Sequence, residues 1–306
     1  MNQINIEKNS VKPFLKWVGG KSQLIEDFEK NLPENFENLE TYIEPFVGAG
    51  AFFFHIKSKY KNFKKFIIAD INSELIITYI TVRDNVNLLI ETLDSLKSEF
   101  LSKTKEERKK FYYDVRKKFN ILKNKKTNNS KQKIQIAAYM IFLNKTCFNG
   151  LYRVNSKNEF NVPMGSYNNP SIFDKDNLIN ISFLIKDVDI FCADFSMVEK
   201  FVDKKSFVYF DPPYRPLKNT SSFTAYSSNG FDDTMQEKLA HFYKQLSSVN
   251  AKLMLSNSDS RLSDYKTDFF DNLYNEFSII RVKANRMVNS KASGRGKINE
   301  ILIKNY

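Results

Sequence analysis

The apolar residues of this 306-residue chain fall into short runs, separated by polar segments and by stretches with helical spacing. Short runs of β-branched and aromatic residues that end at an acid, a glycine or a proline predict buried strands. Such strand-like segments begin at residues 41, 65, 189, 206, 252, 277 and 298. Apolar residues at intervals of three and four predict a helix over 233–246. Strands that alternate with helices predict an α/β fold with a mixed, mostly parallel sheet and helices on both faces.

The pattern changes between residues 81 and 175. One amphipathic helix is predicted there by Leu89, Leu93, Leu96 and Phe100, and a second by the apolar run at 134–143. Residues 144–167 contain Asn-Gly and Ser-Lys-Asn turns between alternating residues, which predicts a β-hairpin. We therefore expect an α/β domain built from residues 1–80 and 176–306, and a mainly helical inserted domain at 81–175.

The net charge of +12 is concentrated in two segments. Residues 97–133 hold fourteen lysines and arginines against four acids, and residues 281–297 hold six basic residues and no acid. A charge run is usually a solvated helix face. Two such concentrations in a chain that otherwise nearly balances favour a polyanionic partner, because neutralised phosphates release counterions.

Composition excludes several classes of site. Two cysteines and two histidines cannot supply a disulfide framework, a zinc cluster or a histidine-based triad, so we expect no metal. The chain has no long uncharged apolar segment. We therefore expect a soluble cytoplasmic protein that does not enter a membrane.

The strand at 206–210 ends in Asp211-Pro212-Pro213-Tyr214. Neither proline can donate to a neighbouring strand, so pairing stops there. The segment then offers the Asp211 carboxylate, the Pro212 carbonyl and the Tyr214 ring. Two acceptors beside a ring suit a flat molecule that carries an amino group. Alone, the motif could equally be a stiff turn.

A second site is predicted where the strand at 41 leads into Phe46-Val47-Gly48-Ala49-Gly50. A glycine turn between a strand and a helix lets a ligand lie against bare backbone, and Asp70 at the tip of the next strand can accept the hydroxyls of a ribose. Asp194 ends a third strand. In an open parallel sheet these strand ends share one crevice, so we expect a nucleoside cofactor beside the flat substrate.

Six motifs, in this order, resemble the Dam-type DNA adenine-N6 methyltransferases of the alpha group. They are Lys16-Trp17-Val18-Gly19-Gly20-Lys21, Phe46-Val47-Gly48-Ala49-Gly50, Ala69-Asp70-Ile71-Asn72, Asn149-Gly150-Leu151-Tyr152-Arg153, Phe160-Asn161-Val162-Pro163 and Asp211-Pro212-Pro213-Tyr214. The resemblance covers nearly the whole chain and is greatest to the branch that modifies GATC in restriction-modification systems. It implies a Rossmann-like fold that binds S-adenosylmethionine, with the insertion as target-recognition domain.

The resemblance also implies roles for individual residues. The residues that would line the S-adenosylmethionine site, with Asp211 at its edge, are Trp17, Lys21, Phe46, Gly48, Gly50, Asp70, Asp194 and Phe195. Asp211, Pro212 and Tyr214 would hold a flipped adenine and act in catalysis. The residues that would contact double-stranded DNA are Lys16, Phe148, Asn149, Leu151, Arg153, Pro163, Tyr167 and Arg295, with Arg153 reading a guanine edge. A cognate restriction endonuclease and a monomeric enzyme are further expectations.

Three alternatives stay open from the residues. Cytosine-N4 methylation uses the same architecture, although that group more often carries serine where Asp211 stands. An RNA adenine methyltransferase would share the basic face. A nucleic-acid-binding protein without catalysis would leave the glycine turn and Asp70 without a use.

Overall fold

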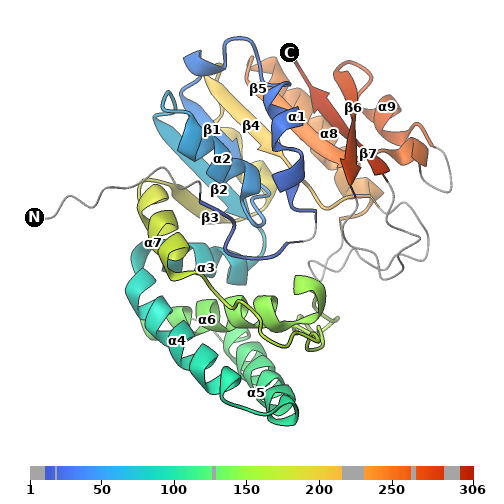
Figure 1. Cartoon of the computed structure of the whole chain (residues 1–306). Coiled ribbons are helices and arrows are strands. Elements are labelled where there is room, and N and C mark those ends of the chain that lie inside the picture. Colours follow the sequence, from blue (N-terminus) through green and yellow to red (C-terminus); the bar gives the residue numbers. More distant parts are fainter. Residues whose placement is uncertain (1–10, 18, 126–128, 216–230, 263–266, 286–296) are drawn as a thin grey trace, which may run out of the picture.

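The computed structural model describes residues 11–17, 19–125, 129–215, 231–262, 267–285 and 297–306. A seven-stranded sheet forms its upper lobe, and a helical lobe lies below it (Figure 1). The strands are β1 (Thr41–Glu44), β2 (Lys65–Asp70), β3 (Asp189–Cys192), β4 (Ser206–Phe210), β5 (Lys252–Ser258), β6 (Ser278–Asn285) and β7 (Lys297–Lys304). The helices are α1 (Ile25–Glu29), α2 (Ala51–Lys59), α3 (Ser73–Asp84), α4 (Val86–Leu101), α5 (Lys105–Lys123), α6 (Ser130–Thr146), α7 (Lys175–Leu184), α8 (Asp233–Ser248) and α9 (Phe269–Leu273).

The strand order is β3-β2-β1-β4-β5-β7-β6. The first five strands in this order run parallel, whereas β7 is antiparallel to both of its neighbours. This confirms the expected α/β fold with a mixed, mostly parallel sheet. The chain moves from β1 to β2 on one side and places β4 on the other, so a topological switch point lies between β1 and β4. Ligands of such sheets bind beyond the strand ends at this point.

The continuous apolar runs reflect a sheet that is covered on both faces. Along β1 and β4, Tyr42, Phe207 and Tyr209 pack into one cluster with α2 and α3. The alternate residues Ile43, Val208 and Phe210 pack into a second cluster with α8. Because successive strand residues point to opposite faces, both sets must be apolar. The buried strands thus hold the site residues that follow them rigidly in place.

The insertion consists of α4, α5, α6 and the segment that follows α6. Its apolar residues join the same cluster as α3, so the two lobes share one continuous core. The boundary that we placed at residue 81 falls inside α3, and the division into two domains stays a prediction. The expected hairpin at 144–167 is irregular, since it pairs only through isolated antiparallel bridges, Cys147 with Met164 and Val154 with Phe160.

Candidate active site

Asp211 follows β4 directly and lies beside residues from two other elements. Its Oδ1 atom accepts a hydrogen bond from Ser256 Oγ on β5 at 3.0 Å and lies 3.0 Å from the Lys21 ammonium nitrogen. Burial raises the pKa of Asp211, and the nearby Lys21 charge opposes that shift. The Tyr209 hydroxyl oxygen in turn lies 2.9 Å from Ser256 Oγ, within hydrogen-bond distance. The carboxylate is therefore fixed in orientation, with both of these contacts on one oxygen.

Lys21 occupies the centre of this group. Only 4 % of its side chain is exposed, and its ammonium lies 4.3 Å from the centre of the Tyr214 ring and 4.0 Å from Glu300 Oε2. The Tyr214 hydroxyl donates to the same Glu300 oxygen at 2.7 Å. Burial also raises the pKa of Glu300, again against the influence of Lys21. One ammonium thus lies beside two partly buried carboxylates and covers one face of the Tyr214 ring.

The glycine turn lies at the adjacent strand end. Gly48 and Gly50 have φ angles of +48° and +72°, and a Cβ on Gly50 would lie 2.5 Å from the Tyr79 hydroxyl oxygen. Only glycine therefore fits there. The backbone N–H of Gly48 donates to Asp70 Oδ2 at 3.1 Å, and the backbone N–H of Asn72 donates to Asp70 Oδ1 at 2.9 Å. Burial raises the pKa of Asp70 to about 6, although these amides lower it.

The other predicted cofactor residues surround this turn. Trp17 packs within 3.0 Å of the position that a Gly48 Cβ would take. The rings of Phe46 and Phe195 stack with centres 5.5 Å apart. Asp194 Oδ1 accepts from both Ser196 N and Ser196 Oγ and so caps the turn after β3. Gly48 and Gly50 let Trp17 and Tyr79 pack directly against the backbone of the turn, and Asp70 places a carboxylate at the adjacent strand end.

The irregular hairpin carries the predicted DNA contacts. Phe148 is 45 % exposed, and Asn149, Arg153 and Pro163 are exposed as well. Arg153 donates through Nε to Asn161 Oδ1 at 2.8 Å. Leu151, in the same segment, is half-buried. The hairpin thus presents an aromatic ring, an amide and a guanidinium to solvent on one segment.

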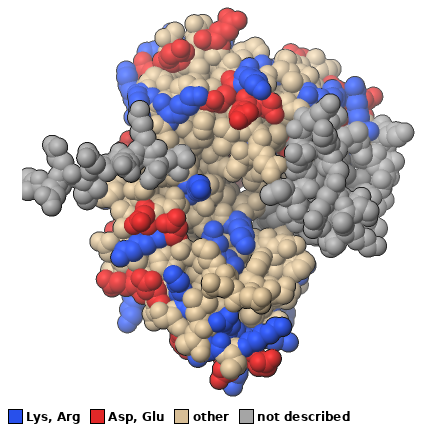
Figure 2. All heavy atoms as spheres, viewed as in Figure 1, with Lys and Arg blue, Asp and Glu red and all other residues tan. Residues whose placement is uncertain are grey.

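The Asn144 side chain links the backbone at Lys16 to the hairpin through hydrogen bonds. It accepts from Lys16 N at 2.8 Å and donates to Lys16 O at 2.8 Å and to Gly150 O at 3.0 Å. The Lys16 ammonium then lies 4.7 Å from the centre of the Tyr167 ring. Figure 2 shows lysine and arginine atoms on the walls of the hollow between the two lobes. Arg295 lies outside the described residues.

Comparison with known proteins decides the family. Residues 17–288 match the D12 class of N6 adenine-specific DNA methyltransferases. The chain is 54 % identical to the type II methyltransferase M.MjaIII of Methanocaldococcus jannaschii over 97 % of this chain and 99 % of the relative. It is 35 % identical to a DNA adenine methylase of Haemophilus influenzae over 95 % of this chain and 92 % of that protein. The chain belongs to the D12 class of N6 adenine-specific DNA methyltransferases.

Membership of the D12 class settles the type of reaction. The expected adenine-specific DNA methyltransferase is confirmed, and the cytosine-N4, RNA and non-catalytic alternatives are set aside. S-adenosylmethionine is the methyl donor of the family. A type II methyltransferase of Lactococcus lactis subsp. cremoris, M1.LlaDCHI, is 39 % identical over the whole of this chain and 99 % of its own length. The described residues contain neither a group suited to hold a metal ion nor a helix long and apolar enough to cross a bilayer.

Several residues of this D12 site had no sequence signal that pointed to them. Glu300 and Ser256 come from strands late in the chain, and only the strand order brings them to Asp211. Lys145, at the end of α6, lies near Lys16, and burial lowers its pKa to about 8. Much of the basic run lies on the exposed side of α5, as at Lys109 and Lys117, so that part is a solvated helix face.

Proposed function

We propose that this chain methylates N6 of adenine within GATC in duplex DNA, as a cytoplasmic monomer that protects DNA from a cognate restriction endonuclease. We further propose that the adenine is flipped from the duplex into the cluster of Asp211, Pro212 and Tyr214. The observation that carries the proposal is the fixed Asp211 carboxylate at the switch point, next to a glycine turn suited to a nucleoside.

Adenine N6 is a poor nucleophile because its lone pair is delocalised into the ring. Hydrogen bonds from the amino group to the Asp211 carboxylate and the Pro212 carbonyl favour a pyramidal nitrogen and stabilise its developing positive charge. Both described contacts of Asp211 fall on Oδ1, which leaves Oδ2 to face the amino group. When N6 takes the methyl group of the donor, the Asp211 carboxylate and the Pro212 carbonyl would remain as acceptors for the N6 proton that is then lost, directly or to water.

Tyr214 supplies the stacking surface for the base. Because Lys21 covers one face of the ring, the adenine would stack on the other face. Stacking returns part of the free energy lost when the base leaves the helix. The bond to Glu300 holds the ring in orientation before the base arrives. S-adenosylmethionine would supply an electrophilic methyl group from a pocket lined by Trp17 and Asp70.

Duplex specificity would come from the hairpin and its neighbours. Arg153 has the planar fork that reads a guanine edge, and Leu151 and Pro163 offer apolar contacts for a thymine methyl. Phe148, exposed at the tip, would fill the space that the flipped base leaves. These roles follow the family resemblance, and the exposure of Arg153 and Phe148 supports them.

One labelling experiment tests the proposal. Purified protein is incubated with tritiated S-adenosylmethionine and two duplexes that differ only in one GATC site, and the product nucleosides are analysed. We expect N6-methyladenine only in the GATC duplex. We also expect Asp211→Ala to abolish transfer but to bind DNA normally, and Asp187→Ala, a change at an exposed surface acid, to keep full activity. Equal labelling of both duplexes would refute GATC specificity, and full activity of Asp211→Ala would refute the assigned chemistry.

A further inference from the structure

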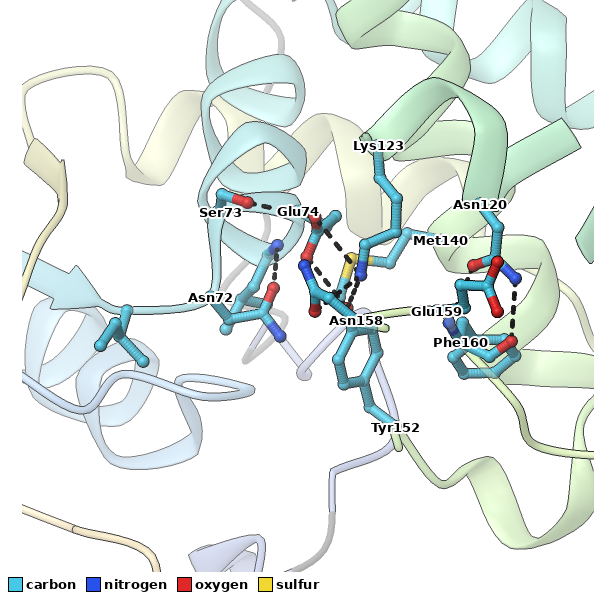
Figure 3. A network of polar contacts seen from close by, with 12 residues as sticks. Asn72, Ser73, Glu74, Asn120, Lys123, Met140, Tyr152, Asn158, Glu159 and Phe160 are labelled. Atoms are coloured by element: carbon cyan, nitrogen blue, oxygen red, sulfur yellow. Dashed lines mark hydrogen bonds and ion pairs between the residues drawn. The ribbon is translucent and has the colours of Figure 1, made fainter. Parts of the chain in front are cut away.

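A second buried polar cluster lies at the junction of α3, α5 and the hairpin (Figure 3). Tyr152 donates from its hydroxyl to Glu74 Oε2 at 2.9 Å, and the Lys123 ammonium lies 3.5 Å from Glu74 Oε1. Lys123 also donates to the Tyr152 hydroxyl oxygen at 3.2 Å. The three side chains therefore form a closed triangle between three separate segments, and all three are buried.

Tyr152 connects this cluster to both halves of the proposed site. It lies in the chain between Leu151 and Arg153, which are proposed to read DNA. Its ring stacks on Trp17, with ring centres 5.8 Å apart and an angle of 21° between the planes. Trp17 in turn packs against the glycine turn at Gly48. One side chain thus touches the wall of the cofactor pocket while it forms part of the hairpin.

The cluster also continues into the first turn of α3. The Asn72 side chain caps that helix by accepting from Leu75 N, and the Asn72 backbone N–H donates to Asp70, the proposed ribose acceptor. Burial raises the pKa of Tyr152 well above its usual range, the Glu74 charge adds to the rise and the Asn72 side chain opposes it. The phenol is therefore protonated and remains a donor to Glu74.

Burial of an ionisable pair at this junction has a free-energy cost. Burial lowers the pKa of Lys123, which reflects the cost of holding a charge there. A buried ion pair is often no more stabilising than apolar residues of the same volume, whereas the loss of one partner is strongly destabilising. The triangle is satisfied only while the hairpin, α5 and α3 keep one relative position. It therefore favours that position over small displacements of the hairpin.

Asn120 on α5 strengthens this link. It accepts from Phe160 N at 2.8 Å and donates to Phe160 O at 3.0 Å, so it holds the second arm of the hairpin (Figure 3). The first arm is held by Tyr152 to Glu74 on α3. The two arms of the hairpin are thus bonded to α5 and to α3, and the first arm also stacks on Trp17.

We propose that Tyr152 is a positioning residue that couples DNA engagement by the hairpin to the cofactor pocket, through its hydroxyl bond to Glu74 and its stack on Trp17. The coupling rests on the proposed function and deepens it. A duplex seated on the hairpin raises the affinity for the cofactor, and the bound cofactor raises the affinity for the duplex by the same factor, because coupling between two binding sites is reciprocal.

The test is a comparison of binding in two hydroxyl-deletion variants. Binding of S-adenosylhomocysteine is measured by calorimetry with and without a GATC duplex in wild type, Tyr152→Phe and Tyr112→Phe. The Tyr112 hydroxyl is also buried and bonds the hairpin, at Val162 O at 2.8 Å, but has no described bond to Glu74. We expect the duplex to raise wild-type affinity about fivefold or more. This factor should fall to near one in Tyr152→Phe and persist in Tyr112→Phe.

Trp17 provides a second readout, because it is the only tryptophan in the chain. Its emission should change when the duplex binds to the wild type and to Tyr112→Phe, and change less in Tyr152→Phe. Affinity of the DNA-free protein for S-adenosylhomocysteine should stay the same in all three, which a general loss of folding would not allow. Equal coupling factors in wild type and Tyr152→Phe would overturn the inference, as would independent binding of both ligands by the wild type. A wild type that binds neither ligand would overturn the proposed function as well.

Discussion

Replacement of Lys21 by methionine tests the electrostatic design of the site. The substitution keeps the hydrocarbon volume of a side chain that is 4 % exposed and removes the charge that lies 3.0 Å from Asp211 Oδ1. Burial already raises the pKa of Asp211, and Lys21 is the first cause that opposes it. An opposite charge at this range lowers a carboxyl pKa by about 1–3 units, or about 1.4–4 kcal/mol. We expect the Asp211 pKa to rise by that amount in Lys21→Met.

The consequence is measured in the pH dependence of methyl transfer. Only the ionised carboxylate stabilises positive charge on N6, so the acidic limb of kcat should move up by about 1–3 pH units. Single-turnover rates at saturating cofactor and duplex separate this effect from product release. Lys57→Met is the matched control, since Lys57 is also buried and paired, with Asp187, away from the site. An acidic limb at the same pH in Lys21→Met and wild type would refute the reasoning.

The effect of Lys21→Met on the unfolding free energy should also depend on pH, through the ionisation of Asp211. Because the folded pKa of Asp211 lies above its ordinary value of 3.8, the stabilisation from its neutral form is complete below that value. It is lost as the pH rises through the folded pKa. Without Lys21 the ionised carboxylate is less well compensated. The loss of unfolding free energy in Lys21→Met should therefore be larger at neutral pH than at about pH 5 when urea unfolding is compared.

Two further predictions concern other parts of the site. Burial raises the pKa of Asp70 to about 6, and a ribose diol would donate to its ionised form. The affinity for S-adenosylhomocysteine should therefore fall about tenfold for each pH unit below that pKa. Calorimetry that shows a constant affinity down to about pH 5 would contradict this. Asn144→Ala should lower the unfolding free energy by about 2–4 kcal/mol, because the buried Gly150 carbonyl and two part-buried backbone groups of Lys16 lose their partner. Asn177→Ala removes a similar reciprocal pair at the exposed surface and should cost less than about 1 kcal/mol in the same urea assay.

Local patterns were sufficient to predict the sheet and the positions of its ligand-facing ends. The run at 206–210 is apolar on both faces because the clusters above and below the sheet both use it, and this produces an unbroken signal. Gly50 was predictable for a similar reason, since the backbone there has a positive φ and no room for a side chain. Each signal is carried by the residue types of one short segment, although the contacts that require them, such as Tyr79 against Gly50, come from other elements.

The partners of the Asp211 carboxylate could not be predicted in this way. Ser256 and Glu300 reach Asp211 and Tyr214 because β5 and β7 take particular places in the strand order. Residues 45 and 86 positions apart in the chain carry no joint pattern that a single sequence reveals. The same holds for Lys123, which belongs to a basic run by composition but lies buried against Glu74.

The two buried polar clusters share one physical feature, a lysine that stabilises an otherwise unfavourable carboxylate. At Asp211 both contacts fall on Oδ1, so Oδ2 is open to the substrate that we propose for this site. At the junction, Glu74 Oε2 accepts from Tyr152 while Oε1 accepts from Ser73 and faces Lys123, so both oxygens have a partner within the protein. The open oxygen thus distinguishes Asp211, which we propose meets the adenine amino group, from Glu74, which holds the hairpin. By this criterion, Asp211→Asn should reduce the chemical step, whereas Glu74→Gln should reduce the coupling between DNA and cofactor binding.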